Sequence, residues 1–367
     1  MSELPAFNWS NKRVFLTGHT GFKGGWLALW LASKGAIVRG YSLDPYTDPN
    51  FFAQTRLSSL IEDLRGDIRN PETLDAALHS FAPDVVFHLA AQPLVRLSYI
   101  DPITTYETNV IGTTRVLDAI RRASSVKAVV SVTTDKCYEN IEDPLHAYAE
   151  TDPLGGYDPY SSSKACAELV SSAYRQSFFP TARIADHNCA VATARAGNVI
   201  GGGDWSTDRL LPDLIRGFLA NEPVLIRRPH AVRPWQHVLE PLMGYIQLAE
   251  HLLSEDREQA AHHATAYNFG PTKSDAQPVQ WIVEKMATLW SPSATWTLDP
   301  DPGPHEAGYL MLDATKARTQ LAWQPRLNLE TALHWLVDWY KASAEGADMQ
   351  AFTLNQIAVY EALVTTT

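Results

Sequence analysis

Two residues able to do acid–base chemistry stand four positions apart in the chain, Tyr160 and Lys164. On a helix this spacing places both side chains on one face. A neighbouring ammonium lowers the pKa of a phenol, so the phenolate becomes accessible as a general base toward an alcohol. An exposed helix pair would show the same spacing, so the catalytic interpretation depends on what surrounds the two residues.

A polar cluster, Thr133-Thr134-Asp135-Lys136, follows the β-rich run 128–132. Open α/β sheets bind their ligands beyond the carboxyl ends of the strands. We therefore expect Thr134, Asp135 and Lys136 to lie at such an edge, close to the tyrosine and the lysine.

A glycine-rich turn lies near the start of the chain, with Gly18, Gly21 and Gly24 at Gly-x-x-Gly-x-x-Gly spacing. It follows the apolar run 14–16 and precedes apolar residues at helical spacing, so it joins a buried strand to a helix. Such a turn lets the backbone approach a pyrophosphate, which the helix N-terminus then faces. In this context the glycines predict a dinucleotide site. The other turn residues expected at this site are Thr20, Phe22 and Lys23.

The end of the second strand should bind the adenosine ribose, through an acidic residue about 20 positions after the turn. Asp44 lies at that distance from the third glycine, and Ser42 is the alternative if Asp44 falls beyond the strand. No arginine is expected at the strand tip to meet a 2′-phosphate, since Arg39 falls mid-strand, so NAD is preferred over NADP. Asp67 and Ile68 are expected to flank the adenine, although Asp67 could instead cap the helix that follows it.

Strands alternate with helices through the first 196 residues. Strand-like runs, separated by helical patterns, fall at 36–41, 85–89, 128–132 and 190–194. This alternation predicts an α/β fold, a Rossmann-type doubly wound parallel sheet covered by helices on both faces. We expect an NAD-binding domain over residues 1–196, to which a segment near 234–260 returns. A smaller mixed α/β substrate-binding domain should occupy most of 197–367.

These motifs, in this order, resemble the extended short-chain dehydrogenase/reductase family. The match runs through the glycine turn, His88-Leu89-Ala90-Ala91, Asn109, Thr134, the Tyr160/Lys164 pair, Asn198, Arg233 and Asp313 with Lys316. It covers most of the chain and implies a tightly bound NAD that is regenerated in each turnover. The further cofactor-binding residues that it implies are Leu89, Ala90, Ala91 and Thr108. The residues that it assigns to a nucleotide-sugar substrate are Gln92, Arg96, Asn198, Arg209, Arg233 and Trp235.

The pair Asp135-Lys136 discriminates among members of this family. Sugar 4-epimerases usually carry small or neutral residues after the catalytic threonine, whereas the common 4,6-dehydratases carry Asp-Glu. Asp-Lys resembles the dehydratases that act on CDP-glucose, as do the glycine turn and the segment Arg233-Pro234-Trp235-Gln236-His237-Val238. The resemblance implies that CDP-glucose is converted to CDP-4-dehydro-6-deoxyglucose, for deoxysugar synthesis in surface polysaccharide such as lipopolysaccharide.

The same resemblance gives the residues roles. Tyr160 takes the proton of the sugar 4-hydroxyl, Lys164 keeps Tyr160 ionised and binds the nicotinamide ribose, and Thr134 hydrogen-bonds the 4-oxygen. Asp135 protonates the leaving 6-hydroxyl. Lys136 removes the carbon-5 proton if its pKa is lowered, stabilises an enolate, or simply pairs with a neighbouring acid. The residues alone do not choose among these three roles.

Several other residues have competing interpretations. His88, at a buried strand end, is expected to be packed and hydrogen-bonded rather than catalytic. Trp235 could close the site or fill the core. Guanidinium groups bind phosphate bidentately. The further candidates for the substrate diphosphate, beside Arg233, are Arg195, Arg227 and Arg228.

Composition bounds the remaining possibilities. A net charge of −11 argues against binding to nucleic acid or to an anionic membrane. Three cysteines suit a reducing cytoplasm, and neither cysteine nor histidine spacing predicts a metal site. By family analogy, helices near 105–123 and 160–178 form the interface of a homodimer or a higher homo-oligomer. The alternatives are a dehydratase or 4-epimerase for another nucleotide sugar, and a non-catalytic NAD-binding regulator.

Overall fold

The computed structural model describes residues 7–300 and 308–364. Its centre is a seven-stranded sheet in the order β11-β6-β5-β4-β1-β2-β3, and every neighbouring pair is parallel. The strand order reverses between β1 and β4, which confirms the predicted doubly wound α/β architecture. The strands are β1 (Arg13–Thr17), β2 (Ile37–Ser42), β3 (Glu62–Arg65), β4 (Val85–His88), β5 (Ala128–Val132), β6 (Ala190–Ala196) and β11 (Ala266–Phe269).

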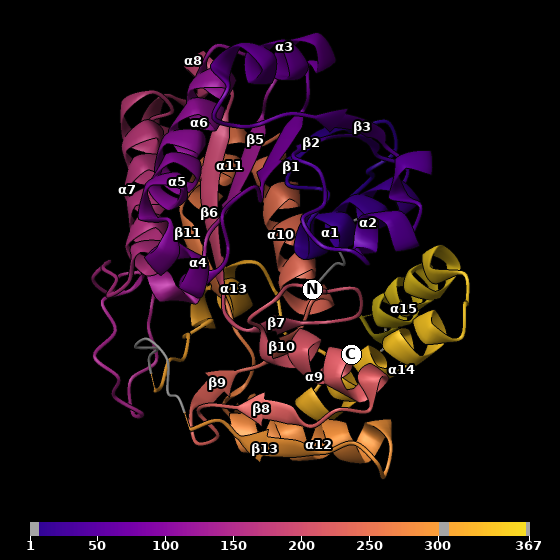
Figure 1. Ribbon diagram of the computed structural model, residues 1–367. Helices are drawn as coiled ribbons and strands as arrows, with labels where there is room; N and C mark the ends of the chain where they lie inside the picture. Colours follow the sequence, from indigo (N-terminus) through magenta and orange to yellow (C-terminus); the bar gives the residue numbers. More distant parts are fainter. Residues whose placement is uncertain (1–6, 301–307, 365–367) are drawn as a thin grey trace.

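Helices cover both faces of this sheet (Figure 1). Alternate residues of β1 enter different cores, since Val14 and Leu16 lie in the larger core and Phe15 in the smaller one. This alternation is typical of a strand that is buried on both faces. The larger core includes residues of α1 (Phe22–Ser33), α10 (Leu239–Leu252) and α11 (Arg257–His263), and the smaller one those of α3 (Pro71–Phe81), α6 (Thr113–Arg121) and α7 (Pro159–Ser177).

The remaining elements form a smaller mixed α/β region below the sheet in Figure 1. Its short strands pair as β7 (Val199–Ile200) with β10 (Gln236–His237), β8 (Val224–Ile226) with β13 (Trp296–Leu298), and β9 (Val232–Pro234) with β12 (Ala276–Pro278). Its longer helices are α9 (Leu210–Ala220), α12 (Val279–Trp290) and α14 (Leu329–Ala344). Shorter helices elsewhere are α2 (Phe51–Gln54), α4 (Val95–Ile100), α8 (Ile184–His187) and α13 (Thr315–Gln320). Among the described residues, no helix combines the length and the apolar character that crossing a bilayer requires.

Two later segments return to the NAD-binding half. Strand β11 extends the main sheet beside β6, so the return runs past the predicted limit of 260 to Phe269. The last helix, α15 (Met349–Val364), packs on α1, where Trp30 meets Tyr360 edge-on and donates a hydrogen bond to Glu361 at 2.8 Å. A lone short apolar run does not reveal its partner strand, which is why the sequence places β11 in the second domain.

The helical stretch predicted near 105–123 is interrupted. A π-helical turn, η2 (Glu107–Gly112), joins α5 (Pro102–Tyr106) to α6. Such turns are frequent at functional sites. Here the turn carries the buried Asn109, whose amide nitrogen donates to the Ser163 hydroxyl at 2.9 Å and so ties the turn to α7.

Candidate active site

Four polar residues meet beyond the carboxyl end of β5. The short helix η3 (Asp135–Cys137) follows β5 closely, and α7 packs against it. Thr134, Asp135, Tyr160 and Lys164 are all less than a tenth exposed. The Thr134 hydroxyl donates to Asp135 Oδ1 at 2.9 Å. The structure thus brings together residues from the two segments that the sequence singles out.

Burial governs the proton affinities of the tyrosine and the lysine. It raises the pKa of Tyr160 to about 12, although hydrogen bonding with Thr134 and the positive charge of Arg209 oppose the shift. Burial also lowers the pKa of Lys164 to about 8. Desolvation therefore dominates the pKa of Tyr160 in the chain by itself, and the lowering of that pKa by Lys164 stays a prediction. Ionising Tyr160 requires further positive charge within the site.

Asp135 is suited to act as an acid. Burial raises the pKa of its carboxyl above the ordinary value of 3.8, against the opposing charge of Lys136. A Cβ on Gly197 would lie 2.5 Å from Asp135 Oδ2, so the glycine makes room for the carboxyl. Lys136 is half-buried, and within the described part of the chain its ammonium pairs with neither Asp135 nor Glu139. No direct ion pair between described residues supports the simple pairing interpretation, although the charge of Lys136 acts on Asp135, and a role toward substrate stays open.

The glycine turn lies at the point where the strand order reverses. Gly18 has a φ of +85°, and a Cβ there would lie 2.8 Å from the backbone nitrogen of Ala90. A Cβ on Gly24 would lie 2.1 Å from the Gly18 oxygen. The Thr17 hydroxyl accepts hydrogen bonds from the backbone N–H groups of Leu89 and Ala90, both at 3.2 Å. The resulting cradle of backbone at the N-terminus of α1 fits the pyrophosphate of a dinucleotide.

The tip of β2 differs from expectation. Ser42 ends the strand and hydrogen-bonds to the Thr20 hydroxyl at 2.8 Å, whereas Asp44 is exposed beyond it. Arg65 of β3 lies beside Ser42 in the parallel register and reaches Asp44 at 3.5 Å. The expectation that no arginine lies at this tip is wrong, because a neighbouring strand supplies one. Asp63, 2.9 Å from Arg65, helps to balance its charge.

Of the two residues expected near the adenine, Asp67 borders a surface cavity. Asn70 caps α3, since its side chain accepts hydrogen bonds from two backbone N–H groups, whereas Asp67 pairs with Arg69 at 2.7 Å. The alternative role of Asp67 as a helix cap is therefore wrong. Ile68 is buried beside it. The cavity has a volume of about 540 Å³ and is lined by Asp67, Arg69, Asn70, Glu107, Ile111 and Arg115.

Lys23 lies among the catalytic residues. Its ammonium donates to the Tyr245 hydroxyl at 2.9 Å, on α10. Burial, together with the positive charges of Lys164 and Arg209, lowers the pKa of Lys23 to about 7. Tyr245 is a site residue that the sequence does not reveal, because α10 lies more than 200 positions away from the turn.

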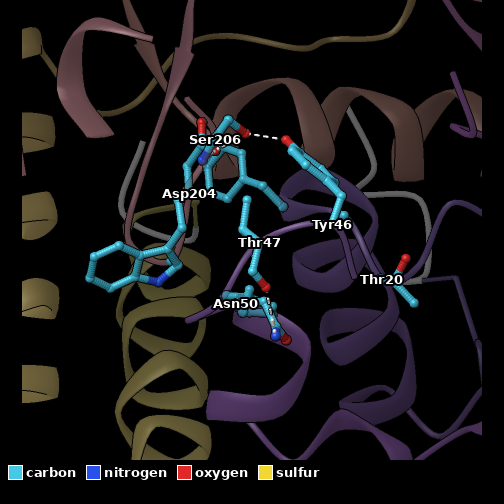
Figure 2. A pocket seen from close by; sticks show the side chains of 11 residues that line it. Thr20, Tyr46, Thr47, Asn50, Asp204 and Ser206 are labelled. Carbon is cyan, nitrogen blue, oxygen red and sulfur yellow. Dashed lines mark hydrogen bonds between the residues drawn. The ribbon is translucent and has the colours of Figure 1, made fainter. Parts of the chain in front are cut away.

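A second cavity borders the glycine turn (Figure 2). The Tyr46 hydroxyl, from the segment after β2, hydrogen-bonds to the Ser206 hydroxyl, which lies before α9. Thr20 lies on the same side as Tyr46 in this view, below it and to the right. The contact joins the two regions of the molecule beside the dinucleotide cradle.

Two residues predicted to bind substrate are occupied by contacts within the protein. Trp235 is buried and its indole nitrogen donates to Gln277 O at 3.1 Å, so it fills the core. The Gln92 amide nitrogen donates to Leu94 O at 3.0 Å and to the Thr105 hydroxyl at 2.9 Å. Both side chains shape loops around the site instead of presenting free groups to a ligand.

His88 is packed and hydrogen-bonded, as predicted. Its two ring nitrogens contact the hydroxyls of Thr17 at 2.7 Å and Thr113 at 3.0 Å. Burial lowers its pKa to about 3, so the ring is neutral. It joins the carboxyl ends of β1 and β4 to α6.

Arginines from both regions approach the site. Arg209 pairs with Asp204 at 3.0 Å, and its charge acts on Tyr160. Arg233 of β9 is buried, and its charge acts on Asp135. Asn198 lies between β6 and β7, where its carbonyl accepts the backbone N–H of residue 236 at 3.1 Å. Arg209 and Arg233 therefore stay candidates for contact with an anionic substrate.

The other arginine candidates divide into two kinds. Arg96 of α4 and Arg227 after β8 converge on Asp208, at 3.2 and 4.0 Å, at a partly exposed position. Arg195 is instead buried under the site and pairs with Glu168 at 2.8 Å. Its proposed contact with a diphosphate is therefore wrong, because it has no access to one. Glu168 was not predicted, although its spacing of four from Lys164 places it on the same helix face.

The fold, the glycine turn and the buried tyrosine–lysine pair are those of the extended short-chain dehydrogenases/reductases. A sequence profile described as GDP-mannose 4,6 dehydratase matches residues 15–335. The chain belongs to this family.

Individual relatives within the family give a more specific comparison. The chain is 52% identical, over 97% of its length and 98% of the relative, to the CDP-glucose 4,6-dehydratase of Salmonella typhimurium. It is 26% identical, over 89% of its length and 92% of the relative, to the dTDP-glucose 4,6-dehydratase of Xanthomonas campestris pv. campestris.

Solved structures share the fold. A dTDP-glucose 4,6-dehydratase from Bacillus anthracis, in complex with NAD, superposes with a TM-score of 0.74 at 20% identity, covering 92% of this chain and 99% of the other. MoeE5, in complex with UDP-glucose and NAD, superposes with a TM-score of 0.71 at 25% identity, covering 90% and 99%.

The raised pKa of Asp135 makes a prediction about stability. The folded protein binds the Asp135 proton more tightly than the unfolded chain does. The protonated carboxyl therefore contributes to the stability of the fold, and this contribution is lost as the pH rises from the ordinary pKa of 3.8 through the raised pKa. Asp135→Asn removes that loss. We expect the free energy of unfolding of the variant, relative to that of the natural protein, to be higher at about pH 8 than at about pH 4. Urea unfolding at the two pH values measures this difference.

Asp44→Asn, at an exposed position, is the matched control for loss of one carboxylate. It should shift stability equally little at both pH values. A gain for Asp135→Asn that does not change with pH would contradict the account.

Proposed function

We propose that the chain is a lyase that carries out the NAD-dependent 4,6-dehydration of CDP-glucose to CDP-4-dehydro-6-deoxyglucose. The observation that carries the proposal is the 52% identity, over nearly the full length, to a CDP-glucose 4,6-dehydratase. The site agrees with it, because Asp135 is held beside Thr134 and near Tyr160. A 4-epimerase needs only to remove and return hydride at carbon 4, whereas a dehydratase also needs an acid for the departing hydroxyl.

When bound, NAD would supply the hydride acceptor for carbon 4 of the sugar and, once reduced, the hydride donor for carbon 6, while a proton returns to carbon 5. The glycine turn would hold its pyrophosphate at the N-terminus of α1, and Asp67 and Ile68 would flank its adenine. The carboxylates of Asp44 and Asp63 balance Arg65, which leaves little net positive charge for a 2′-phosphate and favours NAD over NADP. Since the cofactor ends each turnover as it began, it stays bound.

The first step is oxidation at carbon 4. Tyr160 takes the proton of the 4-hydroxyl, and Thr134 hydrogen-bonds the 4-oxygen. Lys164 would contact the nicotinamide ribose and contribute positive charge next to the phenol. Because burial alone keeps Tyr160 protonated, the positive groups around the site are needed to ionise it.

The second step is loss of water. The 4-ketone acidifies the hydrogen on carbon 5, and Lys136 removes it as a proton. The electron pair of that C–H bond forms the double bond between carbons 5 and 6, while the bond from carbon 6 to its hydroxyl breaks. Asp135 gives its proton to the leaving hydroxyl, which departs as water. Burial raises the pKa of Asp135, which favours the protonated form that this step uses.

We also propose a homodimer, formed through the helices around η2 and α7. Large apolar side chains are exposed along these elements and α4, namely Ile100, Ile103, Ile111 and Leu169. We place the reaction in the cytoplasm, where the three free cysteines stay reduced, and in the synthesis of a deoxysugar for lipopolysaccharide.

Lys136 is tested by two replacements. Arginine keeps the positive charge but does not accept a proton at neutral pH. If Lys136 is the carbon-5 base, both Lys136→Arg and Lys136→Met should lose water from the substrate more slowly than the natural protein, by roughly 10²–10⁴-fold. Mass spectrometry in deuterated water should show that both variants stop exchanging the carbon-5 hydrogen.

Lys127→Met, at the other end of β5, is the control and should behave as the natural protein. Exchange that survives in Lys136→Arg but not in Lys136→Met would assign Lys136 to stabilising the enolate and place the base elsewhere.

The substrate is tested by incubating the purified protein, without added cofactor, with CDP-glucose and other nucleotide-linked sugars. We expect loss of one water from CDP-glucose, followed by mass and by the alkaline absorbance of the 4-keto product. Water loss only from another donor would make the chain a dehydratase of that sugar. Scrambling at carbon 4 without water loss would make it an epimerase, and bound NAD with no reaction would make it a regulator.

A further inference from the structure

A buried ion pair lies beneath the residues of the active site. Glu168 of α7 and Arg195 of β6 are 2.8 Å apart, with side chains only 3% and 4% exposed. Burial opposes ionisation of Glu168, but the charge and hydrogen bonds of Arg195 outweigh it and lower the Glu168 pKa. Both groups are therefore charged. A buried pair is weak evidence for stability by itself, because desolvation cancels much of the attraction. Its role is better judged from what else it binds.

Glu168 holds the start of the loop 133–138, which we call the catalytic loop. Its Oε1 accepts a hydrogen bond from the hydroxyl of Thr133, the residue just before Thr134. Its Oε2 accepts one from the Thr193 hydroxyl of β6 at 2.8 Å. The carboxylate thus joins α7, the end of β5 and β6 at one point.

Arg195 holds the end of the same loop. Its Nη1 donates to the Tyr138 hydroxyl at 2.7 Å, and the guanidinium lies over the Tyr138 ring at 5.0 Å. The Tyr138 hydroxyl donates in turn to Asn268 of β11 at 2.7 Å. Tyr138 is buried, two residues after Lys136.

We propose that the Glu168–Arg195 pair is a positioning unit, which anchors both ends of the catalytic loop and so holds Thr134, Asp135 and Lys136 against the substrate. The inference rests on the proposed dehydration for what the loop does, but the anchoring itself does not depend on the substrate. Four residues separate the two anchors, so a shift at either end moves the acid and the lysine. Misplacement of reacting groups by about 1 Å can cost roughly 10²-fold in rate.

The two anchors serve different steps. Thr133 adjoins Thr134, which acts at carbon 4, whereas Tyr138 lies nearer to Lys136, which acts in the elimination. Tyr138→Phe removes only the hydroxyl that Arg195 binds. We expect it to slow water loss by roughly tenfold or more while leaving oxidation at carbon 4 faster than elimination. A 4-dehydroglucose nucleotide that still carries its 6-hydroxyl should then accumulate, visible by mass. Tyr138→Phe with water loss at the natural rate and no such intermediate would contradict the second anchor.

Tyr148→Phe is the matched control. Tyr148 is also buried and stacks on Tyr138 with ring centroids 5.1 Å apart, but its hydroxyl binds Asn140 and the backbone of residue 141, outside the catalytic loop. It should leave the ratio of intermediate to product unchanged.

The pair itself is tested by the double variant Glu168→Leu/Arg195→Met. Replacing both charges avoids an unpaired buried ion, so the variant should fold. Its thermal unfolding should stay close to that of the natural protein, while water loss from CDP-glucose falls by roughly 10–100-fold. Backbone hydrogen exchange in 134–138, followed by mass, should accelerate relative to β1 and β4.

The outcomes separate the two proposals. Natural rates and natural exchange in the double variant would overturn the positioning role. If the double variant shows faster hydrogen exchange in the catalytic loop but the natural protein dehydrates no nucleotide sugar, the anchoring role would be upheld and the proposed function overturned. Unfolding of the double variant with natural behaviour of Tyr138→Phe would reduce the pair to a stabilising one and overturn the inference.

Discussion

The carboxyl ends of parallel strands all point the same way, and the site depends on that constraint. β1, β4, β5 and β6 lie near one another in the sheet, at the usual spacing of about 4.8 Å between neighbours. Their ends deliver the glycine turn, the backbone of residues 89–90, the catalytic loop and Arg195 to one edge. Segments more than 170 residues apart in the chain thus share one site without any long loop. Helix α7 supplies the tyrosine and the lysine from one side of that edge.

Enclosure of this edge then sets the charge states. Desolvation raises the pKa of Tyr160 to about 12 and lowers those of Lys164 and Lys23 to about 8 and about 7. The same effect raises the pKa of Asp135. A neutral phenol, a carboxyl that holds its proton more tightly and amines that deprotonate more easily are what a dry site produces before any ligand adds charge. Desolvation therefore favours Asp135 as a proton donor, whereas the phenol must be activated by cations.

The sequence predicts those features of the site that depend on residues close together in the chain. The strand–turn–helix pattern around Gly18 to Gly24, the position of Thr134 to Lys136 after a strand, and the spacing of Tyr160 and Lys164 all predict what the structure shows. The sequence does not reveal which residues of different strands lie side by side in the sheet. Arg65 reaches the tip of β2 only because β3 lies beside it, and β11 joins β6 only through tertiary pairing. The burial of Arg195 likewise follows from packing that a single sequence does not record.

The local patterns also leave the purpose of side chains undetermined. Gln92 and Trp235 fall in segments that resemble substrate-binding motifs, yet their polar groups bind the protein's own loops. Glu168 shows the converse, since the spacing of four from Lys164 was visible but its partners on β5 and β6 were not. Residue type and spacing predict where a group lies on its element, whereas the contacts decide what it does.

The central claim is that one site oxidises carbon 4 and reduces carbon 6 of the same sugar. CDP-glucose carrying deuterium at carbon 4 tests it most directly, with the product examined by mass and nuclear magnetic resonance. We expect a dehydrated product with the deuterium on carbon 6, because the hydride taken from carbon 4 is returned within the same site. Deuterium left on carbon 4 or lost to water would contradict it.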